Sequence, residues 1–172
     1  MKVKLFWSSP TDLDLCLFFK KKNGEVGGIF SNEYRGRKSD LGNLNEFPFM
    51  LHMGDNKEPS EGEEETEQIN VANLNEIDEA YICIVNYDAA VEEEDVTMQR
   101  RCRVELQSDS GDYLEVIADS ADHGPIYCVC TIKNNDGVNS LKKSGGDENH
   151  PEVMDLSTAF EKIPGFELIC NS

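Results

Sequence analysis

Short apolar segments separated by turn signals run through most of the chain and limit the folds it can adopt. Residues 101–106 alternate apolar and polar side chains, which is typical of a strand with one buried face. Residues 13–19 and 81–87 are apolar on both faces and are expected to form central strands. Asn23-Gly24 is a strong hairpin signal between two such segments. Many short strands joined by turns indicate a sandwich of two sheets.

Helical spacing occurs only near the C-terminus. The stripe consists of Val153, Leu156, Phe160 and Ile163. Pro151 suits the first helical turn and Pro164 the stop, while residues 166–170 are expected to form a last strand. We therefore predict a mainly β, single-domain antiparallel β-sandwich over residues 1–172, with one C-terminal helix and a long acidic loop.

The acidic loop is expected to cover residues 51–69. It holds seven carboxylates between Asp55 and Glu67 against one lysine, and Gly54, Pro59 and Gly62 disfavour regular structure. Carboxylates packed this densely repel one another unless a cation holds them. Hard oxygen donors on a glycine-containing loop suit Ca²⁺, which takes about 6–8 oxygens. The alternative is an acidic surface loop that only faces water.

The net charge and the lengths of the apolar runs argue against several classes of partner. A net charge of −18 over 172 residues argues against nucleic acid and anionic membranes, and favours cations or basic proteins as partners. No apolar run approaches the roughly 20 residues needed to span a bilayer, so no membrane insertion is expected. The first residues lack the pattern of a signal peptide, so we expect a cytoplasmic protein.

The cysteines and histidines offer little support for catalysis. Most of the six cysteines lie inside apolar runs, where a reducing compartment leaves them as small buried hydrophobes. A soft-metal or redox role is the alternative, best supported at Cys128 and Cys130, which would share a strand face. The histidines are interpreted as surface or capping residues; they are His52, His123 and His150. The sequence contains none of the motifs of common hydrolases or phosphate-binding loops, and the protein is not expected to be an enzyme.

A second acidic motif is Asp12-Leu13-Asp14. Residues two apart on a strand point the same way, so both carboxylates can converge on one ion. The motif is not an EF-hand, because Cys16 stands where the next acidic residue would be. The alternative is a pair of turn or strand-entry residues.

Three segments in this order and spacing resemble the TerD/TerA family of tellurium-resistance and stress-response proteins. They are Asp12-Leu13-Asp14-Leu15-Cys16, His52-Met53-Gly54-Asp55-Asn56 and Glu65-Thr66-Glu67-Gln68-Ile69. The apolar strand at 81–87 and the segment from Tyr127 to the C-terminal helix fit as well, so the resemblance spans nearly the whole chain. The sequence departs from the family pattern at Glu64, where a second glycine is expected, and at Pro59.

The resemblance implies a β-sandwich that binds Ca²⁺ through the strand pair and the acidic loop, with a cytoplasmic role in resistance to tellurite, phage, colicins or other stress. The implied metal ligands are Asp12, Asp14, Asp55, Asn56, Glu61, Glu63, Glu65 and Glu67. Partners would be calcium and other stress-response proteins.

Three hypotheses follow. The first is a non-enzymatic Ca²⁺-binding interaction module for the stress response. The second is a metal-free acidic scaffold that docks a basic protein. The third is an enzyme acting on a tellurium or thiol compound through Cys128 and Cys130.

Overall fold

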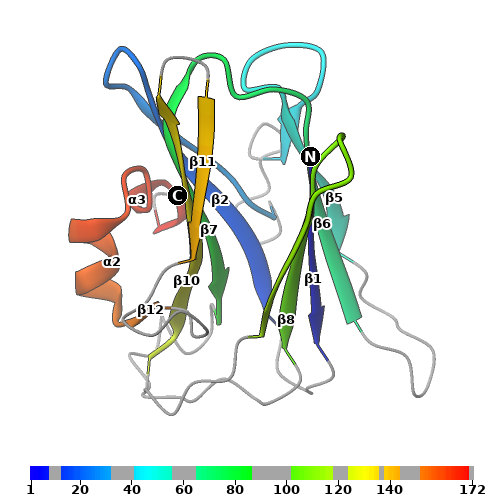
Figure 1. The fold of residues 1–172 in the computed structure, drawn as a ribbon. Coiled ribbons are helices and arrows are strands. Elements are labelled where there is room, and N and C mark those ends of the chain that lie inside the picture. Colours follow the sequence, from blue (N-terminus) through cyan, green and yellow to red (C-terminus); the bar gives the residue numbers. More distant parts are fainter. Residues whose placement is uncertain are drawn as a thin grey trace.

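The computed structural model of the chain describes residues 1–7, 13–31, 41–55, 65–86, 102–117, 124–135, 138–143 and 152–170. Its strands form two antiparallel sheets packed face to face (Figure 1), which confirms the predicted β-sandwich. We name each sheet after its earliest strand. The β1 sheet has the order β4-β5-β6-β1-β8-β9, and the β2 sheet has the order β11-β10-β7-β2-β3, with β12 paired to β10.

The strands of the β1 sheet are β1 (Lys2–Trp7), β4 (Gly42–Asn43), β5 (Met50–Asp55), β6 (Glu65–Val71), β8 (Arg103–Gln107) and β9 (Tyr113–Ile117). The strands of the β2 sheet are β2 (Asp14–Lys21), β3 (Val26–Ile29), β7 (Ile77–Val85), β10 (Ile126–Asn135), β11 (Val138–Lys143) and β12 (Glu152–Met154). Two short helices follow, α2 (Leu156–Lys162) and α3 (Glu167–Cys170).

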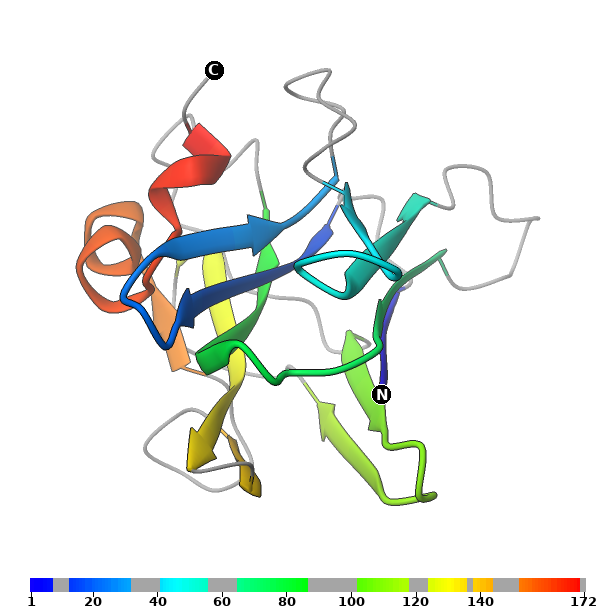
Figure 2. The ribbon, with the colours of Figure 1, turned by 90° about the horizontal axis from the view of Figure 1, so that it is seen from above.

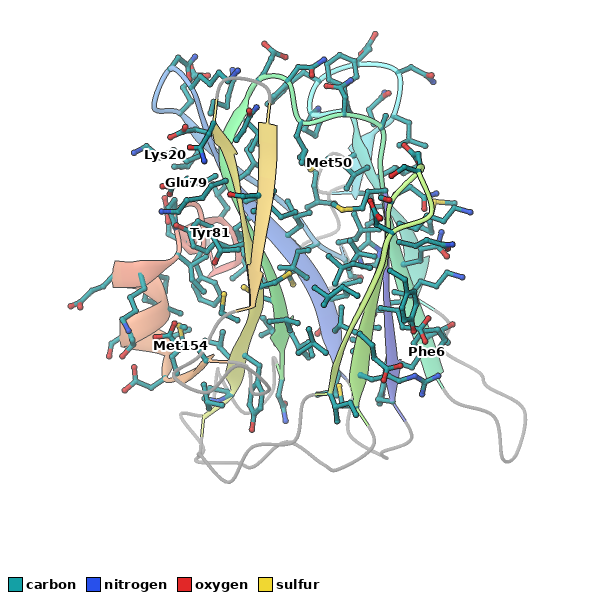
Figure 3. The ribbon with its side chains drawn as sticks, in the orientation of Figure 1. Phe6, Lys20, Met50, Glu79, Tyr81 and Met154 are labelled. Atoms are coloured by element: carbon teal, nitrogen blue, oxygen red, sulfur yellow. The ribbon has the colours of Figure 1, made fainter. Side chains whose placement is uncertain are left out.

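The main core lies between the two sheets. In β1, Val3, Leu5 and Trp7 are buried, while the residues between them are more exposed, as the period of two in a strand requires. Figure 3 shows Met50 inside this layer and Phe6 on the outer side of the β1 sheet. Burying one face of each sheet in this way provides the main apolar contribution to folding.

The β2 sheet is buried on both faces because the helices cover its outer side (Figures 1 and 2). The outer cluster joins the sheet residues Cys16, Phe18 and Val85 to Ala159 and Phe166 of the helical segment. The rings of Phe18 and Phe166 lie 5.2 Å apart between centroids. This second core explains why residues 13–19 and 81–87 are apolar at nearly every position.

The close approach of the helical segment to β3 depends on a glycine. Gly165 has φ +87°, and a Cβ at this position would lie 2.6 Å from the carbonyl oxygen of Gly27. Any other residue would be strained and would also push the two backbones apart. α2 ends at Lys162, which confirms the predicted stop at Pro164, and the adjoining Gly165 lets the helical segment pack closely against β3.

Three details of the C-terminal prediction are wrong. The helix begins at Leu156, not near Pro151, because Asp155 accepts a hydrogen bond from the Thr158 backbone N–H at 2.8 Å and acts as the N-cap. Phe160, placed on the buried stripe by its spacing, is 42% exposed. Residues 167–170, expected as part of a strand, form α3.

Candidate functional site

The acidic loop is shorter than its composition suggested, because strands continue into both of its ends. β5 runs to Asp55 and β6 starts at Glu65, so strand pairing replaces irregular structure over much of residues 51–69. Burial alternates along β6, with Glu67, Ile69 and Val71 inward. Residue 67 faces inward but is a glutamate, so it interrupts the alternation of apolar and polar side chains by which a strand is recognised in a sequence.

Glu67 is the central polar residue of this region. It lies opposite Leu5 in the β1–β6 register, on the inner face of the β1 sheet, and is only 2% exposed. Its Oε2 accepts a hydrogen bond from the Leu15 backbone N–H at 2.5 Å. Leu15 belongs to the other sheet, so this bond ties the start of β6 to the start of β2 across the sandwich.

His52 completes a buried polar unit with Glu67. Its Nδ1 accepts a hydrogen bond from the Gly54 backbone N–H at 3.0 Å, and its Nε2 lies 3.4 Å from Glu67 Oε2. Both side chains are almost completely buried. Because Nδ1 acts as an acceptor, the neutral imidazole carries its proton on Nε2, which faces the carboxylate.

The interpretation of His52 as a surface or capping residue is therefore wrong. The signal that could have identified it is its spacing of two from the buried Met50, which places both on the inner face of β5. The same strand then shifts register between His52 and Asp55, and Gly54 adopts φ +90° there. This bulge lies where β5 enters the acidic loop, and bulges often re-aim a strand beside a functional segment.

Asp14 is buried as well, with 3% exposure, but it lies on the other face of β2. Its register partner on β7 is Val85, which belongs to the helix-covered cluster. Leu15, whose N–H meets Glu67, belongs to the core between the sheets. Asp14 and Glu67 therefore approach β2 from opposite sides.

The predicted ligands divide into three groups. Asp14 and Glu67 are placed completely, and Asp55 and Glu65 are placed by their backbones at the ends of β5 and β6. Four lie outside the described residues: Asp12, Asn56, Glu61 and Glu63. Within the described ranges, no three histidine, cysteine, aspartate or glutamate side chains are arranged to hold a metal ion.

The described strand ends that border these residues lie at one end of the sandwich. Trp7 at the end of β1 pairs with Glu65 at the start of β6, and Asp55 at the end of β5 pairs with Glu67. The Leu15–Glu67 hydrogen bond brings the start of β2 to the same end, the lower end in Figure 1. β2 therefore starts, at Asp14, at the same end of the fold where β5 ends and β6 begins.

Cys128 and Cys130 do not lie on one face of their strand, contrary to the prediction. β10 shifts register between them, so Cys128 pairs with Cys83 and belongs to the outer cluster, whereas Cys130 belongs to the core between the sheets. Cys16 also pairs with Cys83, which makes a row of three thiols across β2, β7 and β10. Neighbouring strands are about 4.8 Å apart, so thiols in a straight row cannot all reach one ion.

These thiols are expected to be chemically inert in the folded protein. Burial raises the pKa of Cys83 well above its ordinary value, and hydrogen bonding to Cys128 raises it further. Burial also raises the pKa of Cys130, and it raises that of Cys102 to about 12. At pH 8 almost no thiolate is present, and the thiolate is the reactive form.

We therefore expect a thiol reagent such as dithionitrobenzoate to modify Cys16, Cys83, Cys102, Cys128 and Cys130 at least about a hundredfold more slowly in the native protein than in 6 M guanidinium. The rates can be followed by absorbance, with the modified residues identified by mass spectrometry. Rapid native modification of Cys128 or Cys130 would instead favour thiol chemistry as the function.

Comparisons with known proteins add no assignment: no protein-family model matches the chain, and no curated protein matches it. Among the described residues, no helix has the length and apolar character needed to cross a membrane.

Proposed function

We propose that this protein is a non-enzymatic, Ca²⁺-binding β-sandwich that acts as an interaction module. The observation that carries the proposal is the Leu15–Glu67 hydrogen bond, which joins the start of β2, at Asp14, to the start of β6, whose neighbour β5 ends at Asp55. Two acidic segments that are about forty residues apart in the sequence thereby share one location. Shared placement is what a cation site needs from its scaffold.

The chemistry of the residues fits a hard cation. The oxygens come from carboxylates and one asparagine, which suit Ca²⁺ better than a soft metal. We assign the contacts to the ion to Asp12, Asp55, Asn56, Glu61, Glu63 and Glu65. Glu67 instead positions the loop, since its Oε2 is already directed at Leu15 N–H and His52. Asp14 is buried at the start of β2, on the face of that strand that the helices cover.

The proposal explains how such a charged loop is compatible with a stable fold. Without a cation, the carboxylates between Asp55 and Glu67 repel one another next to a buried carboxylate. A bound ion removes this repulsion, and the Leu15–Glu67 hydrogen bond links the β6 stem of the loop to the other sheet. The ion-bound loop then offers a defined surface to a partner.

The likeness of the acidic motifs to those of the TerD/TerA family extends the proposal to a role in cytoplasmic stress resistance, with other stress-response proteins as partners. The net charge of −18 supports basic surfaces on those partners. An enzymatic role through Cys128 and Cys130 has less support, because the two thiols lie on different faces of β10 and are both buried.

Calcium is therefore expected to stabilise the fold. At a hundredfold excess over the dissociation constant, the gain is about 2.7 kcal/mol, which corresponds to a rise in melting temperature of roughly 5–10 °C for a domain of this size. Equal Mg²⁺ should do much less, since it demands a small octahedral shell and keeps its waters. Differential scanning calorimetry measures both effects.

Variants locate the site. Asp55→Asn removes one proposed ligand charge and should reduce the Ca²⁺ effect, whereas Glu92→Gln, in a different acidic run of the sequence, removes the same charge and should leave it unchanged. Equal effects of Ca²⁺ and Mg²⁺, or equal effects of the two variants, would show only diffuse negative charge. The metal-free acidic scaffold that docks a basic protein would then replace this proposal.

A further inference from the structure

A cavity of about 560 Å³ lies at the end of the sandwich opposite the one where β5 ends and β6 begins. Its floor is apolar and comes from both sheets, with Val71 and Leu106 from the β1 sheet and Ile132 from the β2 sheet. Leu74, between β6 and β7, and Leu114 on β9 also line it. The volume falls within the roughly 300–1,000 Å³ of typical small-molecule sites.

The rim of this cavity is acidic and is built by the β8–β9 hairpin. Asp109 and Asp112 both line it. The hairpin is closed by hydrogen bonds from Ser108 N to Asp112 O at 2.8 Å and from Asp112 N to Ser108 Oγ at 2.9 Å. These bonds fix the backbone of the turn from which both aspartates extend.

One carboxylate of the rim already holds an ammonium group. The Met1 amino group donates to Asp109 Oδ1 at 3.1 Å and to Val71 O at 2.8 Å. Asp112 accepts a hydrogen bond from Ser110 Oγ at 3.1 Å and, within the described part of the chain, meets no basic side chain. The Tyr113 side chain takes no part in the rim, because it lies on the outer face of β9, where its hydroxyl donates to Glu115 Oε2 at 3.3 Å.

We propose that this cavity is a second binding site, independent of the acidic loop, for a small ligand with an apolar body and a cationic amine. The body fills the space between Leu74, Leu106 and Ile132, and the amine lies at the rim against Asp112. An anionic ligand of the same size is disfavoured, because the rim carries two carboxylates and the ammonium group of Met1 there is already bound to Asp109. This site goes beyond the proposed calcium function and does not depend on it.

The test uses three probes that share a six-carbon chain: n-hexylammonium, 1-hexanol and hexanoate. In methyl-resolved NMR of the full chain, hexylammonium is expected to shift the Leu74, Leu106 and Ile132 methyl signals saturably. Hexanol should shift the same signals with about fivefold weaker affinity, since it lacks the charge, and hexanoate should give no saturable shift. Equal responses to hexylammonium and hexanoate, or shifts scattered over the surface, would overturn the proposal.

Matched variants separate the cavity from the general negative charge of the protein. Asp112→Asn and Glu161→Gln, on the exposed face of α2, each remove one negative charge. Only Asp112→Asn should weaken hexylammonium binding, by about fivefold, and it should leave hexanol binding unchanged. Ala72→Trp, an exposed position on the cavity lining, should block both probes with little risk to folding. Equal weakening by the two charge variants, or normal binding to Ala72→Trp, would show that the cavity is not the site.

Discussion

Val85→Asp is expected to prevent the protein from folding. Val85 is 1% exposed and lies in the helix-covered cluster, so the new carboxylate would lose its water without gaining a cation. It would also stand directly opposite Asp14 in the β2–β7 register and add like-charge repulsion. We expect a loss of more than about 4 kcal/mol, against a typical domain stability of roughly 5–15 kcal/mol.

Urea unfolding and soluble yield measure this effect, and the chain offers a matched control. Val26→Asp makes the same substitution on β3, where the side chain is 41% exposed, and should change stability by no more than about 0.5 kcal/mol. If the two variants unfolded at the same urea concentration, the helices would not seal the outer face of the β2 sheet.

Glu67→Ala is expected to produce the next largest loss, about 3–5 kcal/mol. The truncation leaves the Leu15 N–H without its acceptor, removes the carboxylate that faces His52 Nε2, and opens a void on the inner face of β6. Because the contact joins the two sheets, its loss weakens the whole sandwich and not only the loop. The free energy of unfolding in urea is the measurement.

Two comparisons test this explanation. Glu67→Gln keeps the side-chain volume and one oxygen acceptor for Leu15, so the loss should shrink to about 1–2 kcal/mol. Glu115→Ala removes an exposed glutamate from β9 and should cost no more than about 0.5 kcal/mol. A similar loss in Glu67→Ala and Glu115→Ala would mean that the buried contact contributes little to stability.

The strands and the sandwich could be predicted because alternating apolar and polar side chains indicate directly which face of a strand is buried. Cys102, Val104 and Leu106 face inward as their alternation indicates, and the Asn23-Gly24 turn joins β2 to β3 as expected. The two segments that are apolar on both faces form β2 and β7, which are adjacent strands in the sheet that is covered on both faces.

The polar residues of the candidate site could not be located in this way. His52 and Glu67 occupy inward positions, and their partners are Gly54 N–H and Leu15 N–H, backbone groups that no side-chain pattern reveals. The bulge between Cys128 and Cys130 is equally invisible, because both residues are apolar and suit either face. Composition was enough to identify the acidic segments. The Leu15–Glu67 contact beside them could be found only from the tertiary fold.

The central place of β1 in its sheet has a consequence for synthesis on the ribosome. β1 pairs with β6 on one side and with β8 on the other, so its last partner ends at Gln107. At a translation rate of roughly 5–20 residues per second, several seconds separate the emergence of Val3, Leu5 and Trp7 from that of their final neighbours. During this interval the nascent chain exposes an apolar strand with unpaired edges, a state that invites aggregation and that chaperones protect.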